Sequence, residues 1–206
     1  MKKIILINSH MYSGSEALYF SLNSHPLIQG CKRAGKLSGY TSNLDLFNTA
    51  SKKHKSKLKK SFYLDEVSFN HLLSTKIDYT KLIVINFLRR PKETLESIVH
   101  FKKVNPVFAL RHYQYRMNRM YQVLKKSNKC TFVTFESLDD ESMEAIQNFI
   151  GLDRKVKLSK EMLSSFKSGF KKDTIPKEVI RTAEERYEQY HFLFKDHSPE
   201  SFNSRN

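Results

Sequence analysis

Short unbroken hydrophobic runs alternate along the chain with longer stretches in which hydrophobic residues recur every three or four positions. The runs are typical of strands buried on both faces, as in a parallel sheet, and occupy residues 4–7, 62–65, 82–88 and 131–135. The periodic stretches predict helices at about 17–22, 94–101, 107–124, 142–149 and 175–190, with weaker helix signals from 68 and 158. Because strands and helices alternate, we expect a three-layer α/β/α fold with a central parallel sheet.

A Ser-Gly-Ser turn joins the first strand to the first helix. In a parallel sheet this order places the free N–H groups of the helix's first turn, and the positive end of its dipole, at the carboxyl edge of the strand. Gly14 lets the backbone approach an anion closely, and the hydroxyls of Ser13 and Ser15 add hydrogen-bond donors. The pattern predicts an anion site, although a serine that caps an ordinary helix would give the same sequence.

A later strand-to-helix junction carries two arginines. The hydrophobic run at 82–88 ends in Arg89-Arg90-Pro91, and a proline is favoured in the first turn of a helix. Ligands of parallel α/β proteins lie at the carboxyl ends of the strands. We therefore expect these arginines at a ligand-binding edge of the sheet.

The charge of the chain narrows the class of partner. Its 206 residues carry a formal net charge of +15 at pH 7. This excess favours an anionic partner, such as nucleic acid, a nucleotide, an acidic glycan or a membrane surface. The densest run of lysines, at 51–60, is explained by a solvated loop or helix face more simply than by a binding patch.

Length and cysteine content bound the class of protein. A chain of this length suits one domain, which we expect at 1–194, followed by a polar tail at 195–206. Cys31 and Cys130 are too few for a disulfide framework or a cysteine-based zinc site, and they indicate a reducing compartment. The apolar run at 4–7 is too short for a signal peptide or a membrane span, so we expect a cytoplasmic protein. No cluster of metal ligands is visible in the sequence.

Two motifs make the sequence recognisable. The Ser-Gly-Ser turn is not a Walker A loop, because Gly14 is followed by serine rather than lysine. With the sequence Leu-Asn-Ser-His-Pro at 22–26, it resembles the 5′-phosphosulfate loop of the sulfotransferase family. The later junction is similar to that family's motif R-x-P-x-x-x-x-x-S, with Arg89, Pro91 and Ser97 at the expected spacing. Weaker similarities follow at 133–138, 149–152 and 167–172.

This resemblance implies a fold like that of the P-loop NTPases, and 3′-phosphoadenosine 5′-phosphosulfate (PAPS) as the donor of a sulfuryl group. The acceptor would be a hydroxyl or amine of a small molecule or glycan, and the nucleotide product would be 3′-phosphoadenosine 5′-phosphate (PAP). The motifs assign the 5′-phosphosulfate to Ser13, Gly14 and Ser15, the 3′-phosphate to Arg89 and Ser97, and a loop that closes over the nucleotide to Lys171 and Lys172.

The sequence departs from the family's motifs at positions that carry charge. Tyr12 stands where family members usually have lysine or arginine, and Glu16 directly follows the serines. Asp65 and Glu66 occupy a turn that in many members holds a lysine. The cation that stabilises the leaving phosphate would then come from the polar stretch at 32–36 or from the closing loop.

A hydroxyl acceptor also requires a general base. Glu66 is our first choice because it follows a strand's carboxyl end, and some relatives that sulfate glycans or tyrosine use a glutamate. His10 and His71 are alternatives. Each also has a structural interpretation, Glu66 as a helix cap and His10 as a packed or solvated residue. Glu66, His10 and Tyr12 are the catalytic candidates of the sequence.

Two other classes of function fit the same sequence. A non-catalytic relative would keep the nucleotide site and bind PAP without releasing sulfate. A basic protein that binds nucleic acid or another polyanion would bind in a salt-sensitive manner that does not depend on Arg89. We rank nucleic acid below a small-molecule or glycan acceptor.

Overall fold

A computed structural model of the chain describes residues 3–30, 61–67, 77–153, 155–158 and 175–195. In order along the chain, the elements are β1 (Lys3–Ser9), α1 (Ser15–Asn23), β2 (Ile28–Gly30), β3 (Phe62–Val67), the 3-10 helix η2 (Tyr79–Lys81), β4 (Leu82–Leu88), α3 (Pro91–Lys102), α4 (Pro106–Lys126), β5 (Lys129–Thr134), α5 (Asp140–Ile150) and α7 (Lys177–Phe194).

The strands form one five-stranded sheet in the order β2-β3-β1-β4-β5, and every neighbouring pair is parallel. β1 is the central strand, with Ile7 opposite Glu66 on one side and Ile85 on the other. The carboxyl ends of β1, β3 and β4 therefore meet at one edge of the sheet. The predicted α/β fold with a central parallel sheet is confirmed, and the Ser-Gly-Ser turn begins at this edge.

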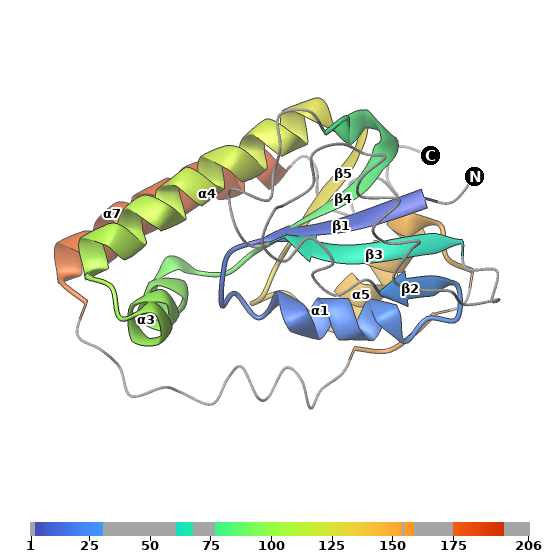
Figure 1. Ribbon diagram of the computed structural model, residues 1–206, viewed down its shortest axis with the longest axis horizontal. Helices are drawn as coiled ribbons and strands as arrows, with labels where there is room; N and C mark the ends of the chain where they lie inside the picture. Colours follow the sequence, from blue (N-terminus) through green and yellow to red (C-terminus); the bar gives the residue numbers. More distant parts are fainter. Residues whose placement is uncertain (1–2, 31–60, 68–76, 154, 159–174, 196–206) are drawn as a thin grey trace.

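Helices cover both faces of the sheet (Figure 1). Alternate residues of a strand point to opposite faces, so Leu6 and Val84 pack beneath α4 and α7, whereas Ile5 and Ile85 pack against α1 and α5. This two-sided burial explains why the strands read as unbroken hydrophobic runs. It also places two polar residues of these runs, at 8 and 86, on the face that α4 covers.

The helix ends follow the expected chemistry, with small shifts of boundary. α3 and α4 both begin with proline, and the Asn105 side chain caps α4 by accepting a hydrogen bond from Phe108 N at 2.8 Å. Gly151 ends α5 in the left-handed conformation, with φ of 89°. α7 continues to Phe194, beyond the expected end near 190.

Two expectations about strands are corrected. The short strand β2 was not predicted, because three residues carry too little periodicity to be recognised. β3 extends to Val67, so Asp65 and Glu66 lie in the strand and not in a turn after it, and both are buried. The helices expected from 68 and 158 lie outside the described residues.

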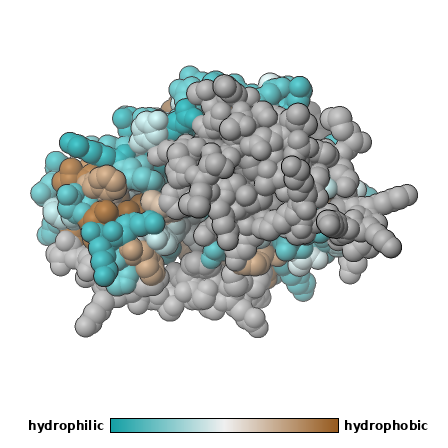
Figure 2. All heavy atoms as spheres, viewed as in Figure 1, coloured by the Kyte–Doolittle hydropathy of each residue, from teal (hydrophilic) through white to brown (hydrophobic). Residues whose placement is uncertain are grey.

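A group of hydrophobic side chains is exposed on the face drawn in Figure 2. Figure 2 shows it at the end of the molecule where α3 ends and α4 begins, and the large exposed residues there include Phe101, Val107 and Phe108. Within the described ranges, no helix is both long enough and apolar enough to span a membrane.

A candidate anion site at the carboxyl edge of the sheet

The turn between β1 and α1 has two residues with left-handed backbone conformations. Tyr12 has φ of 57° and Gly14 φ of 84°, both in the left-handed region, and α1 begins at the next residue. Gly14 is the N-cap, and no side chain caps the helix. A serine cap, the simpler interpretation of the sequence, is therefore not what forms here. Within the first turn Ala17 N donates to the carbonyl of Gly14 at 3.1 Å, and the positive end of the helix dipole lies at the loop.

The Ser13 hydroxyl lies inside this loop without a partner. Ser13 is only 1% exposed, and its Oγ is one of three buried side-chain atoms of the described residues that have no hydrogen-bond partner. Leaving a hydroxyl unpaired in the protein interior costs about 1–3 kcal/mol. A donor that is buried beside the start of a helix and lacks a protein partner is suited to a ligand oxygen.

The Ser15 hydroxyl, in contrast, is engaged by a carboxylate. Ser15 Oγ donates to Glu66 Oε1, which also accepts a hydrogen bond from Ser9 Oγ at 3.2 Å. The two serine hydroxyls are 3.0 Å apart. Glu66 is buried at the end of β3, next to the central strand. The structure thus brings Glu66 to the loop, although it binds the hydroxyl that the sequence assigned to phosphosulfate.

Arg89 reaches the loop from the end of β4. Its Nη1 donates to the carbonyl of Tyr12 over 3.5 Å, and its guanidinium lies 4.5 Å from the centre of the Phe135 ring. Burial lowers the pKa of Arg89 from its usual value, with the nearby Glu93 and Glu136 acting in the opposite direction. A charged fork donor therefore lies next to the backbone of the Ser-Gly-Ser loop, and its role at the 3′-phosphate stays a prediction.

Ser97 lies in α3, two turns after Arg89 along the chain. Ser97 is buried, and its Oγ donates to the carbonyl of Glu93 in the same helix at 2.7 Å. The hydroxyl would have to turn away from this carbonyl to meet a phosphate beside Arg89. Its role at the 3′-phosphate stays a prediction.

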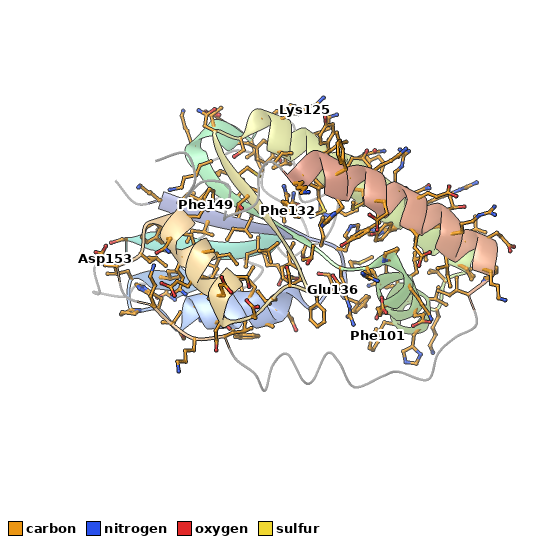
Figure 3. All side chains as sticks on the ribbon, turned by 180° about the vertical axis from the view of Figure 1, so that it is seen from behind. Phe101, Lys125, Phe132, Glu136, Phe149 and Asp153 are labelled. Atoms are coloured by element: carbon orange, nitrogen blue, oxygen red, sulfur yellow. The ribbon has the colours of Figure 1, made fainter. Side chains whose placement is uncertain are left out.

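The side chain of Tyr12 is an aromatic ring that packs on α3. The rings of Tyr12 and Phe101 are stacked, with centroids 4.7 Å apart and an angle of 25° between their planes. Figure 3 shows Phe101 on the same side of the molecule as Glu136. Glu136 follows β5 and accepts a hydrogen bond from Arg90 N at 2.9 Å. This aromatic contact holds the loop against α3 and supplies no charge to a bound anion.

His10 is buried completely under α4. Its ring stacks on Tyr113 with centroids 4.4 Å apart, and its Nε2 lies 3.1 Å from Met117 Sδ. Burial, and then the positive charge of Arg116 and the neighbouring His112, hold the pKa of His10 well below its usual value. The ring is therefore neutral at pH 7. A neutral histidine has the right protonation state for a base, but with no exposed surface this one does not meet an acceptor in this conformation.

Arg116 is a buried polar residue near the loop that the sequence motifs do not include. It is completely buried in the middle of α4, where its Nε donates to the carbonyl of Ser9 at 2.8 Å and its Nη2 donates to Asn8 Oδ1. The signal was present in the spacing, because Arg116 lies three residues after Tyr113 and four before Met120, on the hydrophobic stripe of the helix. A charged residue on a buried stripe marks an interior polar contact.

The other predicted residues, Lys171, Lys172, His71 and the polar stretch at 32–36, lie outside the described residues. In the described part of the chain, no group of three or more histidine, cysteine, aspartate or glutamate side chains is placed to hold a metal ion.

Comparison with known proteins adds information about the fold. No family model and no curated protein matches this sequence. Among solved structures, the chain is similar to the mouse sulfotransferase SULT7A1 complexed with PAP, at 14% identity and a TM-score of 0.58 over 96% of this chain and 89% of the other. It is also similar to a sulfotransferase from Alicyclobacillus acidocaldarius, at 12% identity and a TM-score of 0.62 over 95% and 96% of the two chains.

A third similar structure is an Arabidopsis thaliana putative steroid sulphotransferase, at 18% identity and a TM-score of 0.50 over 92% of this chain and 76% of the other. At such low identities these similarities concern the fold and not the chemistry. The chain therefore has the α/β fold of sulfotransferase structures, with the Ser-Gly-Ser loop at the carboxyl edge of its central strand.

Proposed function

We propose that this protein binds PAPS at the Ser-Gly-Ser loop and transfers its sulfuryl group to a hydroxyl or amine of a small-molecule or glycan acceptor. The observation that carries the proposal is the buried hydroxyl of Ser13, which has no partner and lies in a left-handed loop at the start of α1. The likeness in fold to a sulfotransferase complexed with PAP supports the same assignment.

The residues at the loop fit a phosphate or sulfate group in part. Ser13 Oγ is a donor that an anion would satisfy, the positive end of the α1 dipole lies beside it, and Arg89 adds a fork of charged donors nearby. The carboxylate of Glu66 opposes the binding of an anion at the hydroxyl of Ser15, because it already accepts a hydrogen bond from that hydroxyl. In this proposal the 5′ group is held mainly by Ser13 and the loop backbone, and Ser15 contributes its N–H.

When bound, PAPS would supply the sulfuryl group: a bond forms between its sulfur and the acceptor atom, the bond from sulfur to the 5′-phosphate oxygen breaks, and the electron pair leaves with PAP. The acceptor must lose one proton in this exchange. We assign that proton to the carboxylate of Glu66, which lies at the carboxyl end of β3 next to the loop. Ser9 and Ser15 orient this carboxylate by their hydrogen bonds.

A second candidate function is nucleotide binding without transfer. The observation that favours it is the stacking of Tyr12 on Phe101, which fills the usual position of the catalytic cation with an uncharged ring. Charge stabilisation of the leaving phosphate is normally a large part of catalysis, so its loss would leave a protein that binds PAP and releases no sulfate.

Calorimetric titration with PAP tests binding, with ATP and 5′-AMP as competing nucleotides. Arg89→Ala is expected to weaken PAP binding by about 1.5–3 kcal/mol, the value of one hydrogen bond to a charged group. Arg181→Ala is the matched control. It removes the same side chain from α7, where Arg181 is 77% exposed and pairs only at the surface with Glu185. We expect this control to bind PAP like the unchanged protein.

Transfer of labelled sulfate to a panel of hydroxyl and amine acceptors then separates the two candidates. PAP binding with transfer supports the enzyme, and PAP binding without transfer to any acceptor supports the non-catalytic protein. If PAP does not bind, or if Arg89→Ala and Arg181→Ala bind it equally well, the assignment of the nucleotide site is wrong. Salt-sensitive binding to polyanions that ignores Arg89 would then point to the remaining class of function.

A further inference from the structure

Arg116 joins α4 to the end of β1, from which the Ser-Gly-Ser loop begins. Its Nε donates to the carbonyl of Ser9, the last residue of β1, and its Nη2 donates to the side chain of Asn8. Asn8 Nδ2 in turn donates to Asn86 Oδ1 at 2.7 Å, across the pairing of β1 with β4. Both asparagines and Arg116 have no exposed surface. A buried polar row therefore runs beneath the start of the loop.

A charge buried in this way is costly. Taking a guanidinium out of water costs several kcal/mol, and an apolar side chain of similar volume is often equally or more stable at such a position. Burial lowers the pKa of Arg116 to about 9; Tyr79 and, to a smaller extent, Glu66 act in the opposite direction, and Arg119 adds to the lowering. The side chain is thus still protonated at pH 7. Packing alone does not explain a charged residue here, whereas a use for the charge at the loop does.

Glu66 indicates what that use is. Its carboxylate holds the hydroxyls of Ser9 and Ser15, so a negative charge lies directly at a loop that is proposed to bind an anion. Without a nearby cation this charge would repel phosphate or sulfate. Arg116 contacts the carbonyl of Ser9, and the side chain of that same residue donates to Glu66. The buried cation and the carboxylate are therefore linked through one residue of β1.

We propose that Arg116 is a positioning residue that adds positive charge to the anion site from beneath the loop. It holds the end of β1 through the carbonyl of Ser9 and offsets the charge of Glu66, in place of the cation that Tyr12 does not provide. It does not touch the ligand. This inference rests on the proposed function, and it adds a residue from α4 that lies outside the loop and outside both sequence motifs.

The test compares inorganic pyrophosphate and PAP binding, by calorimetry, in variants of the full chain. Arg116→Met is expected to weaken pyrophosphate binding about tenfold, since one charge acting across a partly buried site has an effect of that size. Glu66→Gln is expected to strengthen it several-fold. The matched control is Arg119→Met, which removes a charge one turn further along α4 from a half-buried position. We expect the control to leave pyrophosphate binding within about twofold, as for other partly solvated charges.

The double variant Glu66→Gln with Arg116→Met keeps the test decisive if Arg116→Met does not fold, because it leaves neither charge buried without the other. It is expected to bind pyrophosphate about tenfold more weakly than Glu66→Gln alone. Equal binding by these two variants would overturn the inference. Thermal unfolding, recorded for every variant, distinguishes a purely structural role of Arg116 from a role in binding. A purely structural role would lower the melting temperature and leave the affinity of the folded protein unchanged.

The same measurements distinguish this inference from the proposed function. If the unchanged protein binds pyrophosphate in a manner that depends on Arg116 but does not bind PAP, the inference is supported and the nucleotide function is wrong. If PAP binds and its affinity does not change in Arg116→Met, the proposed nucleotide site is supported and the inference is overturned. If the unchanged protein binds neither compound, both are overturned.

Discussion

Replacing Ser13 by alanine should stabilise the free protein and weaken its binding of PAP. Ser13 Oγ is buried, with 1% of the residue exposed, and has no hydrogen-bond partner among the described residues. The unpaired hydroxyl costs about 1–3 kcal/mol in the free protein, and alanine removes both the hydroxyl and this cost. We expect the free energy of unfolding to rise by about 1 kcal/mol, which raises the melting temperature by about 2–4 °C for a chain of this size.

The same substitution removes a donor from the complex. A hydrogen bond from a hydroxyl to a charged group is worth about 1.5–3 kcal/mol, so PAP should bind at least about tenfold more weakly. Opposite signs for stability and affinity are typical of a residue kept for binding, since natural proteins give up stability at their sites. Substitution of a residue kept for structure would lower the stability and the PAP affinity together.

The matched control is Ser21→Ala in α1, the helix that follows the loop. Ser21 is 2% exposed, and its Oγ donates to the carbonyl of Ala17 at 2.8 Å, so this hydroxyl is already satisfied. Loss of that hydrogen bond is partly offset by the higher helix propensity of alanine, and stability should stay within about 0.5 kcal/mol. PAP affinity should not change. If Ser13→Ala lowers the melting temperature, or binds PAP as tightly as Ser21→Ala does, the assignment of Ser13 to the anion site is wrong.

Three further predictions concern stability and reactivity. Gly151→Ala should lower the free energy of unfolding, measured in urea, by about 1 kcal/mol, because φ of 89° strains any L-residue other than glycine. A clash does not contribute, since a Cβ at this position would meet no atom within 4 Å. An unchanged urea midpoint would contradict this prediction. Burial, and then the charges of Arg116 and His112, lower the pKa of His10 in the folded protein. As the pH falls, His10 is therefore protonated in the unfolded state before it is protonated in the folded state. The free energy of unfolding should fall by up to about 1.4 kcal/mol per pH unit below about pH 6.5. His10→Phe should flatten this slope in urea titrations at pH 5–7, and an equal slope in both proteins would refute the assignment. Burial also raises the pKa of the Cys130 thiol. Iodoacetamide at pH 8 should therefore label the peptide that contains Cys130 only after unfolding, as measured by mass spectrometry. Rapid labelling of the native protein would show instead that the thiol is accessible.

Much of the architecture follows from local patterns in the sequence. The run at 82–88 is β4 with both its ends, and Pro91 and Gly151 mark a helix start and a helix end that the structure has. These features depend on neighbours in the chain: an unbroken apolar run, a fixed φ at proline, and the tolerance of glycine for the left-handed region. The expectation that Arg89 lies near the Ser-Gly-Ser loop also follows, because parallel strands bring their carboxyl ends to one edge.

The environment of the site could not be predicted in this way. The bond between Ser15 and Glu66 joins residues 51 positions apart, and the bond between Arg116 and Ser9 joins residues 107 positions apart. Spacing in the sequence does not reveal that Glu66 would lie within β3 and point to the loop, or that His10 would be covered completely by α4. Each depends on the order of strands in the sheet and on how a helix packs over them.

The sequence by itself determined most of the strands and helices, where several of them end, and that a Ser-Gly-Ser turn and an arginine follow two of the strands. Only the tertiary structure decided which of these polar groups are paired, buried or left without a partner, as it did for Ser13, Ser15 and Arg116. The physical reason is that secondary structure depends mainly on residues close in the chain. Burial, hydrogen bonding and charge balance depend on residues that meet only when the sheet and its helices are assembled.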